Sequence, residues 1–293
     1  MLSLPDLPRR LLNSTVIIVT ISAVLWLIDQ PLVFGLLTIG LILLGVGGIW
    51  EYGRITKVHL SPGLVPLLVS CHTLILISFF ISSTQKRLLF LPLFLLLLGG
   101  IMIGIYHFIY PDQAVAAVAQ GFFGLCYISC PIGLFIYILH FSVPLTSMNV
   151  GRAWAIYLLV VTKITDIGAY LGGNLCGKRS LSPYLSPKKT IEGALAGMFC
   201  AMLASCGLIL CYEPLRLFLS IGESVMLGAL MGVLAQFGDL FESLLKRGAG
   251  IKDSGESQRF CRLLGPSGGV LDMIDSLLFT TPLVYLFLIC FYQ

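Results

Sequence analysis

Residues 88–109 read LLFLPLFLLLLGGIMIGIYHFI, a run in which no Asp, Glu, Lys or Arg occurs. About 20 apolar residues in a helix are enough to cross the ~30 Å hydrocarbon core of a bilayer. Because lipid offers no hydrogen bonds to the backbone, a segment at that depth must be helical. This stretch therefore predicts a membrane-spanning helix.

Similar stretches lie on both sides of it along the whole chain. We predict an all-α polytopic membrane protein with about nine spans, at residues 11–28, 31–50, 62–82, 88–109, 116–141, 152–174, 191–212, 222–245 and 270–291. The block at 116–141 contains Pro131 and is compatible with one tilted span or with two short ones. We prefer one span, because two would weaken the bias of Lys and Arg toward one side of the membrane.

The composition agrees with a protein that dissolves in lipid. The chain is 57% hydrophobic and 11% charged, whereas soluble domains carry about a quarter charged residues. We predict one integrated membrane domain with two regions. Residues 1–150 form an N-terminal scaffold of helices, and residues 151–293 form a catalytic region, because charges concentrate there inside spans and at their ends.

The distribution of Lys and Arg sets the orientation. With nine spans, the N-terminus and the two most basic loops fall on the same side, which the positive-inside rule makes the cytoplasm. The first apolar run lacks a small-residue cleavage site, so we expect an uncleaved span. The nine cysteines are scattered. Cys126 and Cys130 lie one turn apart and could ligate a metal, but packed, reduced thiols are the simpler interpretation.

The first of three polar clusters begins inside the span at 152–174. Lys163 and Asp166 share a helix face, either as a self-neutralising pair that holds the helix in place or with Asp166 lining a polar cavity. Downstream, Ser186-Pro187-Lys188-Lys189-Thr190 directly precedes the next span. Ser or Thr can cap that helix, whose free N–H groups attract anions. With its two lysines, this segment predicts an anion site.

The second cluster lies at the end of the span at 222–245. Asp239, Glu242 and Lys246 follow one another at helical spacing, close to Ser243. A basic run continues into the loop with Arg247 and Lys252, followed by Asp253. The helix is otherwise apolar, so these charges favour a polar cavity over a solvated face.

The third cluster opens the last span. Gly265-Pro266-Ser267-Gly268-Gly269 predicts a flexible turn, and Asp272 and Asp275 follow on one helix face. Two carboxylates this close repel each other, so either one is protonated or a cation lies between them. With Asp239 added from the neighbouring span, the predicted occupant is Mg²⁺, which prefers carboxylates and substrate phosphates.

Together the clusters predict chemistry at phosphorus, in which a metal neutralises developing charge and basic groups hold phosphates. An attacking phosphate is already an anion and needs no strong base, which agrees with four dispersed histidines. A transporter is the alternative from another class, because buried charges also mark ion pathways. Against it, these charges gather at one membrane face rather than at the midplane.

Over about residues 160–285 the chain resembles the phosphatidate cytidylyltransferase (CDP-diacylglycerol synthase) family. The similar runs are Thr165-Asp166-Ile167-Gly168-Ala169-Tyr170, Ser186-Pro187-Lys188-Lys189-Thr190-Ile191-Glu192-Gly193, Gly238-Asp239-Leu240-Phe241-Glu242-Ser243-Leu244-Leu245-Lys246-Arg247, Lys252-Asp253-Ser254-Gly255 and Gly268-Gly269-Val270-Leu271-Asp272-Met273-Ile274-Asp275-Ser276. The first half of the chain is similar only in hydropathy.

The resemblance implies a homodimer that converts CTP and phosphatidic acid into CDP-diacylglycerol and pyrophosphate, without nucleic acid. It implies a bacterial inner membrane and an active site that faces the cytoplasm. Mg²⁺ would be held by Asp239, Asp272 and Asp275, and a second, monovalent cation such as K⁺ would be compatible. The implied catalytic residues are Asp239, Lys246, Asp272 and Asp275. The implied substrate-binding residues are Ser186, Lys188, Lys189, Thr190, Ser243, Arg247, Lys252, Asp253, Gly268 and Gly269.

The chain departs from the common family pattern at two positions. Ser267 replaces the usual His before the two glycines, and Met273 replaces the usual Arg between the two aspartates. We interpret Arg259 and Arg262, in a longer loop than is usual, as replacements for the lost positive charge. A CTP-dependent polyprenol kinase is the nearest enzymatic alternative, because it needs the same metal and nucleotide.

Overall fold

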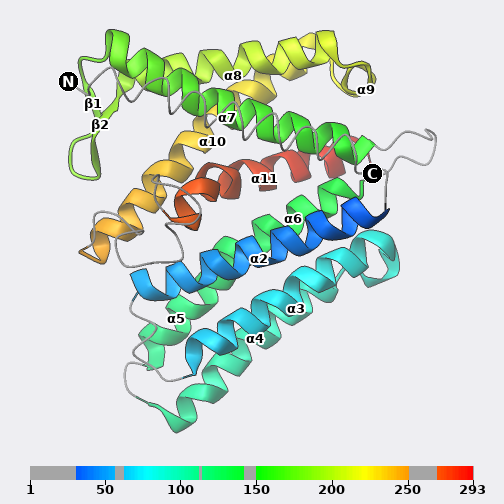
Figure 1. Ribbon diagram of the computed structural model, residues 1–293, viewed down its shortest axis with the longest axis vertical. Helices are drawn as coiled ribbons and strands as arrows, with labels where there is room; N and C mark the ends of the chain where they lie inside the picture. The colour runs from blue at the N-terminus through cyan, green and yellow to red at the C-terminus, as the bar shows by residue number, and fades with distance from the viewer. Residues whose placement is uncertain (1–30, 57–62, 112–113, 142–149, 251–268, 293) are drawn as a thin grey trace.

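The computed structural model describes residues 31–56, 63–111, 114–141, 150–250 and 269–292. Within these ranges, eight helical segments are long and apolar enough to cross a membrane. Helices α7 and α8 lie along one edge of the molecule, α3 and α4 lie along the opposite edge, and α6 and α11 lie between them (Figure 1). The chain is therefore a multi-pass membrane protein.

Each of the eight segments coincides with a predicted span. They are α2 (Pro31–Ile55), α3 (Leu64–Thr84), α4 (Leu91–Ile109), the joined helices α5 (Ala114–Gly124), η3 (Leu125–Ser129) and α6 (Cys130–Leu139), then α7 (Val150–Cys176), α8 (Ile191–Cys211), α10 (Ile221–Gly248) and α11 (Val270–Tyr292). A 3₁₀ turn, η2 (Lys86–Leu88), and a short helix, α9 (Glu213–Arg216), connect neighbouring spans. The span predicted at 11–28 lies outside the described residues.

The block that contains Pro131 is one continuous span, as preferred from the sequence. Proline has no backbone N–H, so Pro131 cannot bond to the carbonyl of Tyr127 four residues earlier. The helix widens at that point into a π-helical turn, η3, and continues as α6 without a break. Cys126 and Cys130 in this region are free thiols.

The predicted all-α architecture is confirmed for the described residues, with the addition of one short hairpin that the sequence analysis did not predict. Between α7 and α8 the chain forms an antiparallel hairpin of β1 (Ser180–Ser182) and β2 (Ser186–Thr190), with Ser182 opposite Ser186. Both serines precede a proline, and a residue before proline favours extended backbone. The repeated Leu-Ser-Pro motif therefore explains the two strands.

Small residues bring α7 and α8 into backbone contact. A Cβ atom added at Gly172 would lie 2.2 Å from the Cβ of Ala196, and one added at Gly197 would lie 2.9 Å from the carbonyl oxygen of Thr165. Between helices in lipid, small residues favour association because they allow such close packing. The contact places the hairpin and the start of α8 beside the polar segment of α7.

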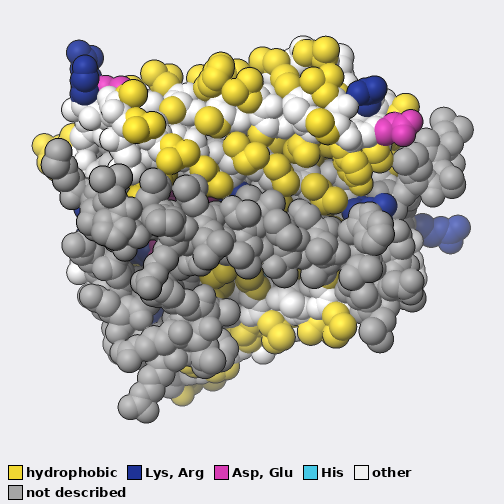
Figure 2. Space-filling model, turned by 45° about the horizontal axis from the view of Figure 1, so that its top comes forward, with side chains coloured by type: hydrophobic (Ala, Val, Ile, Leu, Met, Phe, Trp, Pro, Cys, Tyr) yellow, Lys and Arg dark blue, Asp and Glu magenta, His cyan; other side chains and the backbone are white. Residues whose placement is uncertain are grey.

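The outer surface of the bundle is apolar between charged ends. On α8, Leu195, Phe199 and Leu203 are each 57% exposed, and their spacing of four residues puts them on one helix face. Figure 2 shows hydrophobic side chains spread over the face that α7 and α8 form, with charged side chains toward its margins. This face is suited to contact with lipid chains.

Candidate active site

Polar side chains from four elements gather at one end of the bundle. At this end the β1–β2 hairpin lies beside α7, α10 ends and α11 begins (left side of Figure 1). The three clusters that the sequence singled out therefore come together, although two of them are more than 70 residues apart in the chain.

The hydroxyl group of Ser276 is the meeting point of three carboxylates. Its Oγ atom lies 3.1 Å from Oδ1 of Asp275, 3.2 Å from Oδ1 of Asp239 and 3.4 Å from Oδ2 of Asp166. These aspartates come from α11, α10 and α7. Asp275 is 5% exposed, whereas the side chains of Asp239 and Asp166 are 28% and 29% exposed. Asp275 thus lies on the buried side of the cluster, and Asp239 and Asp166 lie on its more exposed side.

Two lysines partly neutralise this cluster. Nζ of Lys189, on β2, lies 3.0 Å from Oδ2 of Asp239, and Nζ of Lys163, on α7, lies 3.2 Å from Oδ2 of Asp166. The pair of Lys163 and Asp166 that the sequence indicated is thus present, and Asp166 also lies close to the hydroxyl group of Ser276. When all three carboxylates are ionised, they outnumber the two ammonium groups, and this excess of negative charge favours binding of a cation.

A second cluster lies next to the first. Nζ of Lys246 lies 2.6 Å from Oε1 of Glu242 and also pairs with Asp272. Asp272 accepts a hydrogen bond of 3.1 Å from the backbone N–H of Gly269, and so caps the first turn of α11. Glu242 and Lys246 are 3% and 6% exposed, so this ion pair is buried.

Among the described residues, the two aspartates that the sequence assigned to one cation contact different side chains. Asp272 faces Lys246, whereas Asp275 faces Ser276 and Asp239. Asp166, rather than Asp272, is the third carboxylate beside Asp239 and Asp275. A spacing of three residues puts two side chains on neighbouring rows of a helix, and here each row meets a different partner.

The hairpin residues have several roles. The hydroxyl group of Thr190 caps α8 by accepting a hydrogen bond of 3.1 Å from the N–H of Gly193, as expected for a residue before a helix. Ser186 pairs within the hairpin, and Lys188 is exposed. The guanidinium group of Arg247 lies 3.4 Å from the carbonyl oxygen of Leu185, so α10 also contacts the hairpin.

Three predicted site residues, Lys252, Asp253 and Gly268, lie outside the described residues, as do Ser267, Arg259 and Arg262. Ser243 is described, and its hydroxyl group donates to the carbonyl oxygen of Asp239 one turn earlier. Gly269 is buried at the start of α11.

A sequence profile of the cytidylyltransferase family matches residues 8–291. The chain belongs to this family. A phosphatidate cytidylyltransferase of Chlamydia muridarum is 35% identical over 178 residues, which are 60% of this chain and 56% of that protein. The enzyme of the same name from Staphylococcus aureus strain COL is 36% identical over 140 residues, 47% of this chain and 50% of its own length.

An uncharacterized protein of Escherichia coli K12, YnbB, is 39% identical over 145 residues, 50% of this chain and 45% of that protein. The chain thus spans about half the length of the curated relatives it matches. The family resemblance inferred from the motifs is confirmed.

The carboxylate cluster at Ser276 has the donor chemistry of a magnesium site. Mg²⁺ binds carboxylate oxygens and completes its coordination with water and phosphate oxygens. Asp166, Asp239 and Asp275 supply such oxygens around one hydroxyl group. Across the described part of the chain, no three acidic, His or Cys side chains are already arranged as metal ligands. The carboxylates are instead held by Ser276 and the two lysines.

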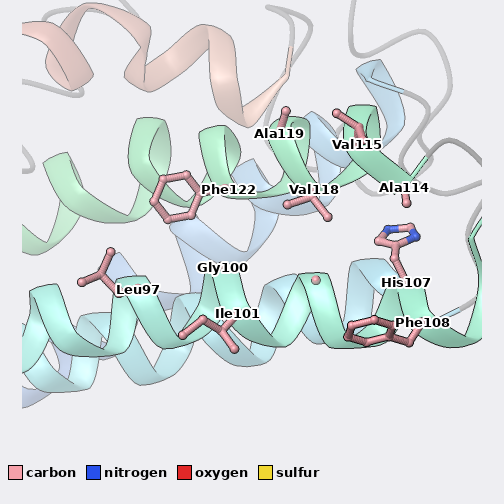
Figure 3. Close-up of a pocket in the computed structure, with 11 residues that line it drawn as sticks. Leu97, Gly100, Ile101, His107, Phe108, Ala114, Val115, Val118, Ala119 and Phe122 are labelled. Atoms are coloured by element: carbon pink, nitrogen blue, oxygen red, sulfur yellow. The ribbon is translucent and has the colours of Figure 1, made fainter.

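A separate pocket of about 700 Å³ lies between α4 and α5 (Figure 3). It is lined mainly by apolar side chains, among them Leu97, Ile101, Phe108 and Phe122. The phosphates of a nucleoside triphosphate need cationic side chains and hydrogen-bond donors, which an apolar wall does not supply. The polar end of α7, α10 and α11 is therefore the better candidate for the chemistry of the family.

The close approach of α10 and α11 at Gly238 brings Asp239 near Asp275, and it can be tested. A Cβ atom at Gly238 would lie 2.4 Å from the carbonyl oxygen of Asp275. We expect Gly238→Ala to destabilise the protein by about 1–3 kcal/mol through overpacking, as a lower unfolding midpoint in detergent. Gly222→Ala, on the same helix with nothing within 4 Å, is the control. Equal midpoints for the two variants would contradict the close contact.

Proposed function

We propose that this chain is a phosphatidate cytidylyltransferase, which converts CTP and phosphatidic acid into CDP-diacylglycerol and pyrophosphate. Family membership supports cytidylyl transfer, and relatives that carry this enzyme name support the lipid substrate. The observation that carries the proposal is the meeting of Asp166, Asp239 and Asp275 at Ser276, beside Lys189. This arrangement can receive a metal and phosphates at the end of a membrane bundle.

In the reaction, a phosphate oxygen of phosphatidic acid attacks the α-phosphorus of CTP. A new P–O bond forms as the bond to the β-phosphate breaks, and pyrophosphate leaves with that electron pair. The attacking oxygen is already anionic, so the protein does not need to remove a proton. Its residues need to align the two substrates and to neutralise the charge of their phosphates. We assign the neutralising role to Lys188, Lys189 and Arg247, which lie on or against the hairpin.

We propose that Asp239 and Asp275 hold Mg²⁺ and that Asp166 is their partner. When bound, Mg²⁺ supplies charge neutralisation at the phosphates. Asp272, assigned to the metal from the sequence, pairs with Lys246 in this arrangement, and its metal-binding role stays a proposal. Its proposed role in the described arrangement is to hold Lys246 toward the site, and Lys246 is proposed to contact a substrate phosphate.

Several finer assignments from the sequence stay proposals. They are a homodimer, a second monovalent cation such as K⁺, a bacterial inner membrane and a site that faces the cytoplasm. The relatives that carry the enzyme name are from bacteria, which supports a bacterial membrane. Lys252, Asp253 and Gly268 are proposed substrate-binding residues on the strength of the family motifs alone.

The proposal is tested with purified protein in mixed micelles that contain phosphatidic acid, Mg²⁺ and CTP labelled in the cytidine. We expect pyrophosphate release and a labelled lipid with the mobility of CDP-diacylglycerol. A polyprenol in place of phosphatidic acid is the comparison, because a kinase would instead release labelled CDP. Release of CDP with the polyprenol and no labelled lipid with phosphatidic acid would contradict the proposal.

A further inference from the structure

A carboxylate from the N-terminal scaffold reaches the start of α11. Glu51, near the end of α2, is 2% exposed. Its Oε2 atom accepts a hydrogen bond of 3.0 Å from the backbone N–H of Leu271. Within the described residues, its Oε1 atom has no hydrogen-bond partner. A buried carboxylate is costly unless it is well satisfied, so this placement needs an explanation.

A glycine on α2 allows Glu51 to reach the start of α11. One turn earlier, a Cβ atom at Gly47 would lie 3.2 Å from a methyl group of Val270. Glycine at this position lets α2 lie close against the first turn of α11. The same contact explains Gly269, because a Cβ atom there would lie 1.6 Å from Oε1 of Glu51.

Two carboxylates therefore accept hydrogen bonds from backbone N–H groups at the start of α11. The first N–H groups of a helix have no partner within the helix. Asp272 accepts from Gly269, and Glu51 accepts from Leu271. Asp272 also pairs with Lys246. If Glu51 were absent, the buried N–H of Leu271 would lose its acceptor, and the first turn that carries Asp272 would lose one of its two anchors.

We infer that Glu51 is a positioning residue for the active site, acting through the first turn of α11 on Asp272 and Asp275. This inference rests on the proposed function, because it concerns the rate of that reaction. Of the proposed phosphate-binding cations, Lys188, Lys189 and Arg247 lie on β2 and α10, and only Lys246 pairs with the turn that Glu51 holds. Loss of Glu51 should therefore reduce kcat by more than it raises the KM for CTP.

Two conservative variants separate position from charge. Glu51→Gln keeps the length of the side chain and a carbonyl oxygen that can accept from Leu271, but it removes the charge. Glu51→Asp keeps the charge but is one methylene shorter and cannot reach the same N–H. We expect Gln to retain wild-type kcat and Asp to lower kcat by on the order of 10²-fold, as misplacement of a catalytic group does.

The experiment is steady-state kinetics in the CTP assay, with unfolding midpoints measured on the same preparations. Gly269→Ala, which crowds Glu51, should lower kcat in the same direction as Glu51→Asp. Gly40→Ala, on α2 with nothing within 4 Å, should behave as wild type. A wild-type kcat for Glu51→Asp, or a loss in Glu51→Gln as large as in Glu51→Asp, would overturn the inference. An inactive wild-type protein would instead contradict the proposed function.

Discussion

Asp275→Asn is expected to lower cytidylyl transfer by on the order of 10³-fold, because a bound metal supplies several kcal/mol of charge stabilisation in phosphoryl chemistry. Asp275 is the most deeply buried of the three carboxylates around Ser276. Asparagine has nearly the same shape and still accepts a hydrogen bond through its amide oxygen. The change therefore removes negative charge from the proposed metal site and disturbs packing little.

The same loss is expected for Asp239→Asn, since Asp239 lies 3.2 Å from the same hydroxyl group. The measurement is the initial rate of pyrophosphate release over a range of Mg²⁺ concentrations, with unfolding midpoints on the same samples. A small loss that is recovered at high Mg²⁺ would still support metal binding by these side chains.

A matched control lies on the helix that carries Asp239. Glu223 is in the first turn of α10, at the opposite end of the helix, where it forms a capping box with Ser220. Glu223→Gln removes one carboxylate charge from the same helix, far from Ser276, and should keep wild-type activity. Full activity in both Asp275→Asn and Asp239→Asn would remove the metal assignment, and equal losses in all three variants would point to a general effect of charge on α10 and α11.

The spans were predictable because their cause is local. Each needs only a run of apolar residues long enough for the bilayer, and residues such as Leu91–Ile109 provide it without reference to the rest of the chain. The hairpin was missed because its signal, the two Leu-Ser-Pro motifs, restricts only the residue before each proline. Whether two such segments pair depends on how α7 and α8 bring them together.

The site was predictable in its residue types but not in its pairing. Helical spacing indicated that Asp272 and Asp275 would begin the same helix, and the structure places them there. Helical spacing alone could not indicate that Asp275 would face Asp239 and Asp166 while Asp272 would face Lys246. That choice depends on the rotation of α11 against α7 and α10, and α10 and α11 are in close contact at Gly238. Glu51 was missed for the same reason, because a lone acid at the end of a span gives no sign of its partner.

Lys246→Met is expected to lower the free energy of unfolding by about 3–5 kcal/mol, the usual cost of breaking a buried ion pair by removing one partner. Lys246 is 6% exposed and pairs with both Glu242 and Asp272. Without the ammonium group, the buried carboxylate of Glu242 would face that of Asp272 with no cation between them. Their repulsion and lost solvation, rather than the missing bond alone, account for the size of the effect.

A compensating variant distinguishes this cause from poor packing of the new side chain. In Glu242→Gln/Lys246→Met, the buried carboxylate is neutral, so most of the lost stability should return although the methionine is still present. Cytidylyl transfer should stay low in the double variant, because the cation proposed to contact a substrate phosphate is still missing.

The measurement is equilibrium unfolding in mixed micelles of dodecyl sulfate and a mild detergent, with Lys178→Met as the control. Lys178 is an exposed lysine at the same end of the bundle, where an isolated surface charge contributes about 0–1 kcal/mol. Equal stability of Lys246→Met and Lys178→Met would show that the ion pairs of Lys246 with Glu242 and Asp272 do not stabilise the protein. Stability that returns in the double variant while activity does not would separate the two roles of Lys246, one in holding α10 against α11 and the other in the proposed reaction.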